Sequence, residues 1–440
     1  MKKYELLNPF TPSSIASNPE EFYGREDEIR TLDRTLRQGS LIIQGPTGIG
    51  KSSLLSRVLL HMEGFSSDNN SKVIICVAHP DIKSVDDAAR LLLEELCLID
   101  SKANKITINL PKFVSYESER AYSYFNEGRY LSSLFKIIED KKFQEVINNS
   151  NYIVFAIDEC DKCPAPIARL IRQILNKTQL NGIKNIRFIL SGVSPFYDYL
   201  VKEDAGINRF IYKSINLGKL HEDEARLLID NKFAMVVADA KENELKLEID
   251  EKMLERIYSL ASGHPHLLQL LGSCVIEHEN ENPDGVIDTF DLLNSLRDIC
   301  YVTRASIYDL IIHTLECHGQ LDSFKEFIDL SEYKIPTVVD KVKAQQYIDA
   351  DSLIWLKKNN IITENNDYQY ELVDEFLRVR IMLDQDDGAI MNKRIMRIAD
   401  TAQRNRVDND MNYEEMMGSR YYNTGGIESI LYYDDEDDES

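Results

Sequence analysis

Short apolar runs alternate with amphipathic stretches over the first half of the chain. Helical spacing predicts helices over 26–37, after residue 50, over 84–98 and over 164–179. Residues 99–150 are polar, aromatic and lysine-rich, and we expect helices joined by loops there. The alternation predicts a parallel sheet with helices on both faces. Five runs have the length and composition of buried strands: 40–44, 72–78, 151–158, 185–192 and 209–217.

The pattern becomes entirely helical from residue 218, up to a turn-rich break at 280–287. Farther on, helices are followed by two short strand-like runs around an Asn-Asn-Asp turn, which indicates a winged-helix-like α+β domain. We therefore expect five segments: an extended lead-in (1–22), an α/β core (23–217), a helical segment (218–282), a winged-helix-like domain (290–384), and a helix followed by a disordered acidic tail (389–440).

Composition narrows the classes of function. The net charge is -23, from 51 basic and 74 acidic residues, and such a surface repels nucleic acid unless its cations are segregated. DNA is therefore a possible partner that the charge does not favour. No apolar run approaches the roughly 20 residues of a membrane span, and the first residues lack the apolar core of a secretion signal. We expect a cytoplasmic protein without membrane contact, whose seven cysteines are reduced thiols.

A glycine-rich loop follows the first predicted strand. Residues 45–52, GPTGIGKS, match the pattern G-x-x-x-x-G-K-[ST] and precede an amphipathic helix, a context that a chance glycine-rich turn lacks. In this pattern backbone N–H groups cradle phosphates, Lys51 reaches the β- and γ-phosphates, and Ser52 ligates Mg²⁺. The sequence thus predicts an ATP·Mg²⁺ site. Its predicted loop residues are Gly45, Pro46, Thr47, Gly48, Ile49, Gly50, Lys51, Ser52 and Ser53.

An acidic pair ends the third predicted strand. Asp158 is expected to hold Mg²⁺, and Glu159 to orient and polarise the water that attacks the γ-phosphate. The alternative is a pair of surface carboxylates at a strand end. The glycine loop upstream favours the catalytic interpretation.

These motifs, in this order, resemble the AAA+-related P-loop ATPases of the STAND and origin-initiator-like group. The lead-in NPFTPSSIASNPEEFYGREDEI and the segment SGHPHLLQLLG (262–272) carry the likeness further. The second resembles the Gly-x-Pro element of the helical lid in STAND proteins. The resemblance implies a P-loop NTPase core (AAA+/STAND type) with a helical lid, and it covers about residues 8–280.

The resemblance also implies roles for residues near the nucleotide. Tyr23, Gly24 and Arg25 would lie near the adenine and the ribose-phosphate, although Arg25 could be a surface helix residue. Pro265 would pack near the nucleotide and couple the lid to its state, or simply begin a helix.

Two further residues take catalytic roles by resemblance. Ser191, or Ser194, would sense the γ-phosphate at the end of the fourth strand; the alternative is an ordinary strand-end hydroxyl. Arg209 would be an arginine finger for a neighbouring subunit, or an exposed, salt-bridging arginine. The lid element GHPHLL lacks the arginine that many AAA+ motors carry there, which favours a switch over a motor.

Two weaker sequence signals, a CxxC spacing and a group of C-terminal cations, have ordinary structural explanations. Cys160 and Cys163 have CxxC spacing but no second ligand pair, so we interpret them as free thiols. The winged-helix-like domain holds cations interspersed with carboxylates, which indicates a solvated face of mixed charge rather than a DNA surface. These cations are Lys341, Lys343, Lys357, Lys358, Arg378 and Arg380.

Three hypotheses of function remain. In the first, ATP bridges core and lid, and slow hydrolysis to ADP and phosphate resets a switch that controls a protein partner or self-assembly. In the second, an initiator- or loader-type ATPase uses its winged-helix-like domain on DNA. In the third, the chain is the ATPase component of a bacterial defence complex with its effector on another chain. The sequence does not fix the partner, the trigger or the oligomeric state.

Overall fold

The protein is described by a computed structural model. It covers residues 4–16, 21–64, 72–100, 102, 105–110, 114–118, 120, 128–332, 334–365 and 368–383. The chain forms two compact units, residues 15–217 and residues 1–14 with everything from 218 onward. The predicted helix and acidic tail over 389–440 lie outside the described residues. Within the described part of the chain, every helix is too short or too polar to span a membrane.

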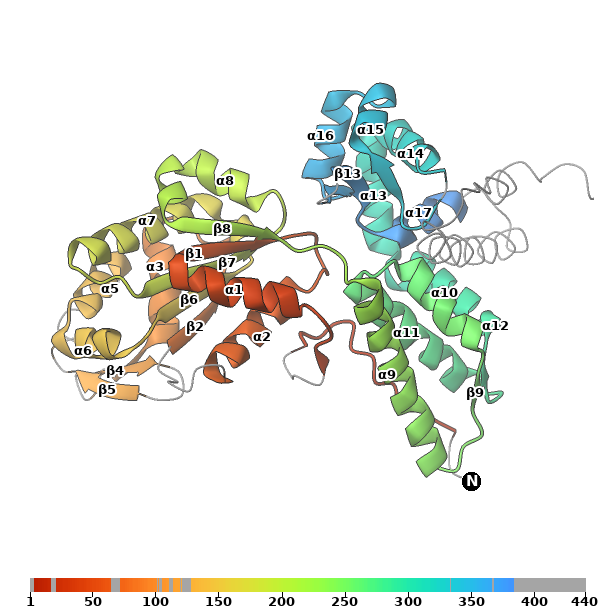
Figure 1. Ribbon diagram of the computed structural model, residues 1–440, viewed down its shortest axis with the longest axis horizontal. Coiled ribbons are helices and arrows are strands. Elements are labelled where there is room, and N and C mark those ends of the chain that lie inside the picture. Colours follow the sequence, from red (N-terminus) through yellow and green to blue (C-terminus); the bar gives the residue numbers. More distant parts are fainter. Residues whose placement is uncertain are drawn as a thin grey trace, which may run out of the picture. The chain divides into compact units, whose positions relative to one another are not determined.

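The first unit is built on a parallel sheet with strand order β2-β6-β7-β1-β8 (Figure 1). This confirms the predicted parallel sheet. All six residues of β6 are buried, because helices cover both faces. The strands are β1 (Ser40–Gln44), β2 (Lys72–Val77), β6 (Ile153–Asp158), β7 (Ile186–Gly192) and β8 (Ile211–Asn216).

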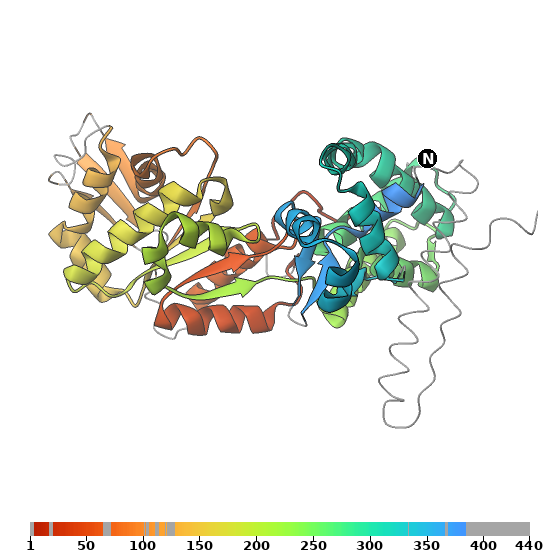
Figure 2. The ribbon, with the colours of Figure 1, turned by 90° about the horizontal axis from the view of Figure 1, so that it is seen from above.

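Two apolar cores lie on the two faces of this sheet. Leu41 and Ile43 pack with Leu32 on one face, and Ile42 packs on the other, as the alternation of side chains along a strand requires. Figure 2 shows α1 on one side of the sheet and the helices of residues 130–203 on the other. The helical elements of this unit are α1 (Glu26–Gln38), α2 (Lys51–Gly64), α3 (Val85–Leu96), α5 (Tyr130–Ile138), α6 (Lys141–Asn149), η2 (Cys160–Lys162), α7 (Pro164–Leu180), α8 (Phe196–Glu203) and η3 (Ala205–Arg209).

The expectation of helices and loops over 99–150 is wrong for its first part. β3 (Cys97–Asp100), β4 (Lys105–Leu110) and β5 (Val114–Ser118) form an antiparallel sheet. The stretch KITINL alternates polar and apolar residues and is rich in β-branched ones, a pattern typical of strands. Its polar and lysine-rich surroundings hid that alternation. The predicted helices are present farther on, as α5 and α6.

The second unit begins with helices and two short parallel strands. Their bounds are α9 (Glu222–Glu242), β9 (Glu248–Ile249), α10 (Glu251–Ala261), α11 (Pro265–Glu281), β10 (Val286–Ile287) and α12 (Thr289–Asp298). The lead-in packs on this helical segment. Phe10 is buried, its ring lies edge-on to Phe233 at 5.3 Å, and the Lys232 ammonium donates to the Pro9 carbonyl at 2.8 Å. A Cβ on Gly272 would lie 2.4 Å from the Phe10 ring, so a larger residue would force this ring to move.

The rest of this unit carries the predicted helices followed by a hairpin. The three strands form an antiparallel sheet in the order β11-β13-β12. The winged-helix interpretation and the finer division of the unit stay predictions. The elements are η4 (Ile299–Thr303), α13 (Ala305–Cys317), α14 (Leu321–Leu330), β11 (Val338–Asp340), α15 (Lys341–Tyr347), α16 (Ala350–Lys358), β12 (Ile362–Glu364), β13 (Gln369–Leu372) and α17 (Glu375–Leu383).

Candidate functional site

The glycine loop joins the end of β1 to the start of α2. Gly48 and Gly50 have φ of 78° and 94°, left-handed values that glycine adopts without strain. A Cβ on Gly45 would lie 2.5 Å from the Leu217 carbonyl oxygen, so only glycine fits beside that chain. The loop therefore has the tight backbone path that an anion-binding loop before a helix needs.

Lys51 is held by the loop that it closes. Its ammonium donates to the carbonyl oxygens of Gly45, at 2.9 Å, and Pro46, at 2.7 Å. Burial lowers the pKa of Lys51 to about 8, while the nearby Asp158 carboxylate acts in the opposite direction. The side chain is thus mostly charged at neutral pH and presents a cation at the mouth of the loop.

Ser52 and Asp158 come together although they lie on different elements. The Ser52 hydroxyl donates to one Asp158 carboxylate oxygen at 2.5 Å, and the Glu159 N–H donates to the other at 2.8 Å. Asp158 is buried at the end of β6. A hydroxyl beside a carboxylate is the all-oxygen donor set that Mg²⁺ prefers, so these residues fit the predicted metal.

Glu159 occupies a strained position. Its φ of 55° is left-handed, which is uncommon for a non-glycine residue and costs free energy. Its carboxylate forms an ion pair with the ammonium of Lys162, three residues farther on. Sequence reasoning missed Lys162, because no motif marks it.

Ser191 lies near the end of β7, beside Ile43 of β1 in the sheet register. It is fully buried, and its hydroxyl has no hydrogen-bond partner among the described residues. A buried hydroxyl without a partner is costly, and a ligand could satisfy it. Asp161, which the motifs do not mark, accepts from the Val193 N–H at 2.9 Å and ties this strand end to the turn that carries Glu159.

Arg25 lies against the loop rather than on the surface. It is only 4% exposed, its guanidinium donates to the Ile49 carbonyl at 3.4 Å, and it pairs with Glu28 at 3.0 Å. Gly24, with φ of 71°, and half-buried Tyr23 precede it. The structure therefore brings this element to the loop.

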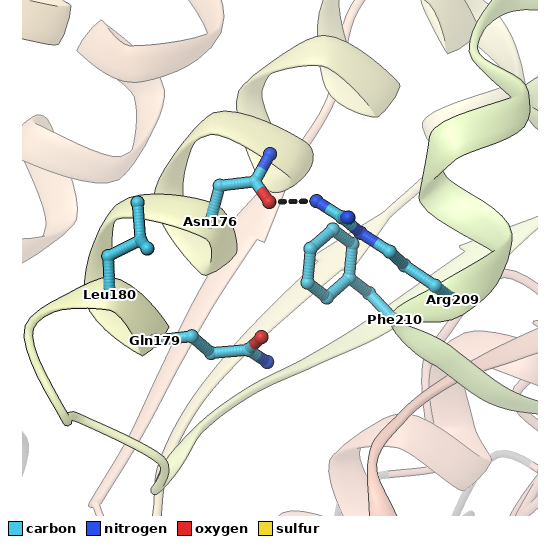
Figure 3. Close-up of a pocket in the computed structure, with 5 residues that line it drawn as sticks. All are labelled: Asn176, Gln179, Leu180, Arg209 and Phe210. Atoms are coloured by element: carbon cyan, nitrogen blue, oxygen red, sulfur yellow. Dashed lines mark hydrogen bonds between the residues drawn. The ribbon is translucent and has the colours of Figure 1, made fainter.

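Arg209 lies away from its own loop. It ends η3, two residues before the first residue of β8, and β8 pairs in parallel with β1 so that Ile211 lies beside Ser40. Arg209 is thus at the edge where β1 begins, whereas the loop follows the other end, roughly 15–20 Å along the strand. Its guanidinium donates to the Asn176 side chain and covers the Phe210 ring at 4.6 Å (Figure 3). Arg209 therefore lies too far from the glycine loop of its own chain to contact a nucleotide bound there.

Pro265 is the first residue of α11 in the second unit, which agrees with the helix-start interpretation. The preceding Gly263 has φ of 72°, and its carbonyl accepts from the Leu220 N–H at 2.9 Å. A Cβ on Gly263 would lie 2.6 Å from the Leu220 carbonyl oxygen. The Gly-His-Pro element is therefore packed against the chain that enters this unit.

The two cysteines after Glu159 are free thiols, as expected. Burial raises the pKa of Cys163 to about 11 and that of Cys160 well above its usual value. Both therefore stay protonated at neutral pH, which argues against a reactive or metal-binding role.

A glycine loop between a parallel strand and a helix, with its serine against a strand-end aspartate, defines a P-loop NTPase. The chain matches the family described as Novel STAND NTPase 1 over residues 4–278, more than half of its length. It belongs to this family of STAND NTPases. The implied AAA+/STAND-type class is thereby confirmed.

Solved structures of two archaeal proteins are similar to the chain. The Aeropyrum pernix ORC2 protein, determined as ADPNP–ADP complexes, is 12% identical, with 93% of this chain and 98% of that chain covered and a TM-score of 0.50. The Walker-type ATPase of Pyrococcus abyssi is 16% identical, with 84% and 99% covered and a TM-score of 0.49. At such identities the likeness to ORC2 shows the fold alone. Among curated protein sequences, none matches the chain.

Proposed function

We propose that the protein binds ATP with Mg²⁺ at the glycine loop and hydrolyses it slowly to ADP and phosphate. The observation that carries this proposal is the 2.5 Å contact between Ser52 and Asp158, on the helix and strand that flank a nucleotide site. Mg²⁺ bound there would neutralise phosphate charge. Lys51 binds the β- and γ-phosphates, and Glu159 orients the attacking water and accepts its proton.

The residues around this centre take supporting roles. Ser191 donates its otherwise unsatisfied hydroxyl to the γ-phosphate. Tyr23, Gly24 and Arg25 face the adenine and the ribose-phosphate, with Arg25 already fixed on the loop. Pro265 couples the second unit to the state of the nucleotide.

Slow turnover is supported by the position of Glu159. Its carboxylate is paired with Lys162, so it must leave this partner to accept a proton from water. A base that is occupied at rest suits a timed switch better than a motor that turns over continuously.

The switch is supported first by the chain that leaves the sheet. The Leu217 N–H donates to the Gln44 carbonyl at 2.7 Å, directly before the glycine loop begins. The Leu217 carbonyl oxygen fills the space that a Gly45 side chain would take. If nucleotide binding shifts the loop, Leu217 must therefore move with it.

The same segment is anchored in the second unit a few residues later. The Lys219 ammonium pairs with the Glu371 carboxylate of β13 at 2.7 Å, and the Leu220 N–H donates to Gly263. Residues 217–220 thus connect the base of the glycine loop to the C-terminal hairpin and to the Gly-His-Pro element. We infer that this segment transmits the nucleotide state and exposes a surface for a protein partner or for self-assembly. In an assembly, Arg209 acts on the nucleotide of a neighbouring subunit.

The experiment compares phosphate release and nucleotide binding in three variants. Glu159→Gln should lose about a hundredfold or more in hydrolysis and keep its affinity for a fluorescent ATP analogue, because a general base affects the chemical step. Lys51→Ala should lose binding. Glu203→Gln, an exposed carboxylate at the end of α8, is the matched control and should behave as wild type. Hydrolysis at the wild-type rate by Glu159→Gln would remove Glu159 from its role.

A DNA-associated function has less support. The C-terminal cations are neutralised within their own domain: Lys341 and Lys357 both pair with Glu364 at 2.7 Å, and Lys343 pairs with Glu332 at 3.3 Å. Residues 290–383 hold ten lysines and arginines against sixteen aspartates and glutamates, a net charge of −6. Duplex binding with a steep salt dependence, lost when these three lysines are replaced, would favour DNA instead.

A further inference from the structure

The turn η2, which follows Glu159, holds the end of β7 from one side. β6 and β7 are parallel neighbours in the sheet, so the residues that follow the two strands meet at the same edge. The Ser191 N–H donates to the sulfur of Cys160. Two residues farther on, the Val193 N–H donates to the half-buried Asp161 carboxylate at 2.9 Å. Two consecutive side chains of the turn thus bind two alternate N–H groups at the end of β7.

The glycine loop holds the same strand end from the other side. The Gly192 carbonyl accepts from the Gly45 N–H at 3.4 Å. A Cβ on Gly192 would lie 3.1 Å from an Asp161 carboxylate oxygen and 2.6 Å from the buried Phe196 ring, so the main chain has little room to move. The end of β7 is therefore placed jointly by the glycine loop and by the turn that carries Glu159.

The hydroxyl of Ser191 follows this main chain. It is buried and has no hydrogen-bond partner among the described residues, so the main chain that carries it sets its position. If the end of β7 moved away from the turn, the hydroxyl would move with it. A hydrogen bond to a phosphate oxygen weakens steeply when its geometry departs from the optimum. The contact between Asp161 and Val193 therefore fixes the position of a donor two residues away.

We propose that Asp161 is a positioning residue that aims the Ser191 hydroxyl at the γ-phosphate. It acts through its hydrogen bond with the Val193 N–H and not through its charge. This inference rests on the proposed nucleotide site and gives a role in it to a residue that no motif marks. Its consequence is discrimination between nucleotides: loss of the hydrogen bond weakens binding of a triphosphate and leaves binding of a diphosphate unchanged.

The test measures how strongly the full-length chain prefers ATPγS, a slowly hydrolysed triphosphate, over ADP. Both are titrated with Mg²⁺ in competition with a fluorescent ADP analogue, and the readout is the ratio of the ADP Kd to the ATPγS Kd. Ser191→Ala should lower this ratio about tenfold, the lower range for a hydrogen bond to a charged group. Asp161→Ala should lower it about fivefold and change the ADP Kd less than twofold.

Two variants separate the hydrogen bond from the charge. Asp161→Asn keeps an oxygen that accepts from the Val193 N–H, so its ratio should be no lower than that of wild type. The Asp161 charge also acts on Lys51, and its removal by itself would favour the more anionic ATPγS, the opposite of the expected loss. Asp198→Ala, which removes an exposed carboxylate from α8, is the matched control and should stay within twofold of wild type.

A double variant tests whether Asp161 acts through Ser191. In the Ser191→Ala background, Asp161→Ala should lower the ratio no further, because the donor that it positions is already absent. Losses that multiply in the double variant would overturn this route, and equal losses in Asp161→Ala and Asp161→Asn would overturn the role of the hydrogen bond.

Failure of this inference differs from failure of the proposed function. A wild-type ratio in Asp161→Ala, beside a lowered ratio in Ser191→Ala, would overturn the positioning role alone. An ADP Kd that rises together with the ATPγS Kd in Asp161→Ala would show a general structural role instead. A wild-type chain that binds neither nucleotide would overturn the proposed function, and the inference with it.

Discussion

Replacing Lys219 by methionine should destabilise the second unit strongly. The Lys219 ammonium lies 2.7 Å from the Glu371 carboxylate and 3.8 Å from that of Glu375. The side chains of Lys219 and Glu375 are 11% and 1% exposed. Burial by itself would lower the pKa of Lys219, but the carboxylates, Glu371 foremost, outweigh it and the pKa is raised. Lys219 therefore stays charged at neutral pH.

The loss of stability in Lys219→Met depends on which carboxylates remain buried without a partner. Removing one partner of a buried ion pair costs about 3–5 kcal/mol, because the other charge loses its compensation. Glu375 keeps two hydrogen bonds of 2.7 Å from Thr337, and Glu371 is 16% exposed. We therefore expect the lower end, about 3 kcal/mol, for Lys219→Met. Glu371→Gln should cost about 1–2 kcal/mol, because its amide oxygen can still accept from Lys219.

The chain offers a built-in probe for this measurement. Trp355, in α16, is the one tryptophan of the sequence and lies in the second unit. Its fluorescence during urea unfolding should show a midpoint lowered by about 1–2 M in Lys219→Met, for a slope of roughly 2 kcal/mol/M. Because the folded pKa is raised, this stability is fully present below the unfolded pKa of about 10.4 and is lost only above it. The loss should therefore be equal at pH 6 and pH 9.

The control is Arg226→Met, which breaks the ion pair with Glu255 in the same unit, where both side chains are about one-third exposed. A pair of this kind contributes about 0–1 kcal/mol. If Lys219→Met shifts the midpoint no more than Arg226→Met does, Lys219 is not a buried anchor and the coupling argument fails.

Three further changes test other parts of the account. Lys162→Met should raise basal phosphate release up to about fivefold, because it frees Glu159. The increase should vanish when Glu159→Gln is added. An unchanged basal rate would show that Lys162 does not hold Glu159 back. Burial raises the pKa of Asp291 from 3.8 to about 6. Between these two pH values the folded state keeps the proton and the unfolded state releases it, so the free energy of unfolding falls as the pH rises. The stability of Asp291→Asn relative to wild type should therefore improve by up to about 3 kcal/mol from pH 4 to pH 7, as measured by urea unfolding, and a constant difference would refute the assignment. Gly272→Ala should cost about 1–3 kcal/mol in the same assay, because its Cβ would lie 2.4 Å from the Phe10 ring, and an unchanged midpoint would show that the lead-in does not pack there.

The core strands could be predicted from the sequence because parallel strands that are buried on both faces read as continuous apolar runs. The run NYIVFAID contains all of β6, and NIRFILSG all of β7. The strands of 97–118 were missed because polar and lysine-rich surroundings hide their alternation. The packing of the lead-in was missed because an extended segment has no periodicity that marks its partner.

The candidate site could be anticipated only where a motif fixes spacing. The glycine loop and Asp158 are marked by their residue types after apolar strands, and the structure brings Ser52 and Asp158 into contact. Lys162 and Asp161 carry no such mark, because any polar residue suits the turn after β6. Lys219 and its partner in β13 are also distant in sequence, and only tertiary structure pairs them.

Native mass spectrometry with and without ATP·Mg²⁺ tests the nucleotide switch most directly. Wild-type chain should bind one nucleotide per subunit and convert with ATP to a defined oligomer, whereas Lys51→Ala should neither bind nor assemble. Glu159→Gln should hold unhydrolysed ATP in the assembled state. A wild-type chain that binds ATP and remains a monomer would contradict self-assembly as the output. Nucleotide binding undiminished in Lys51→Ala would contradict the site itself.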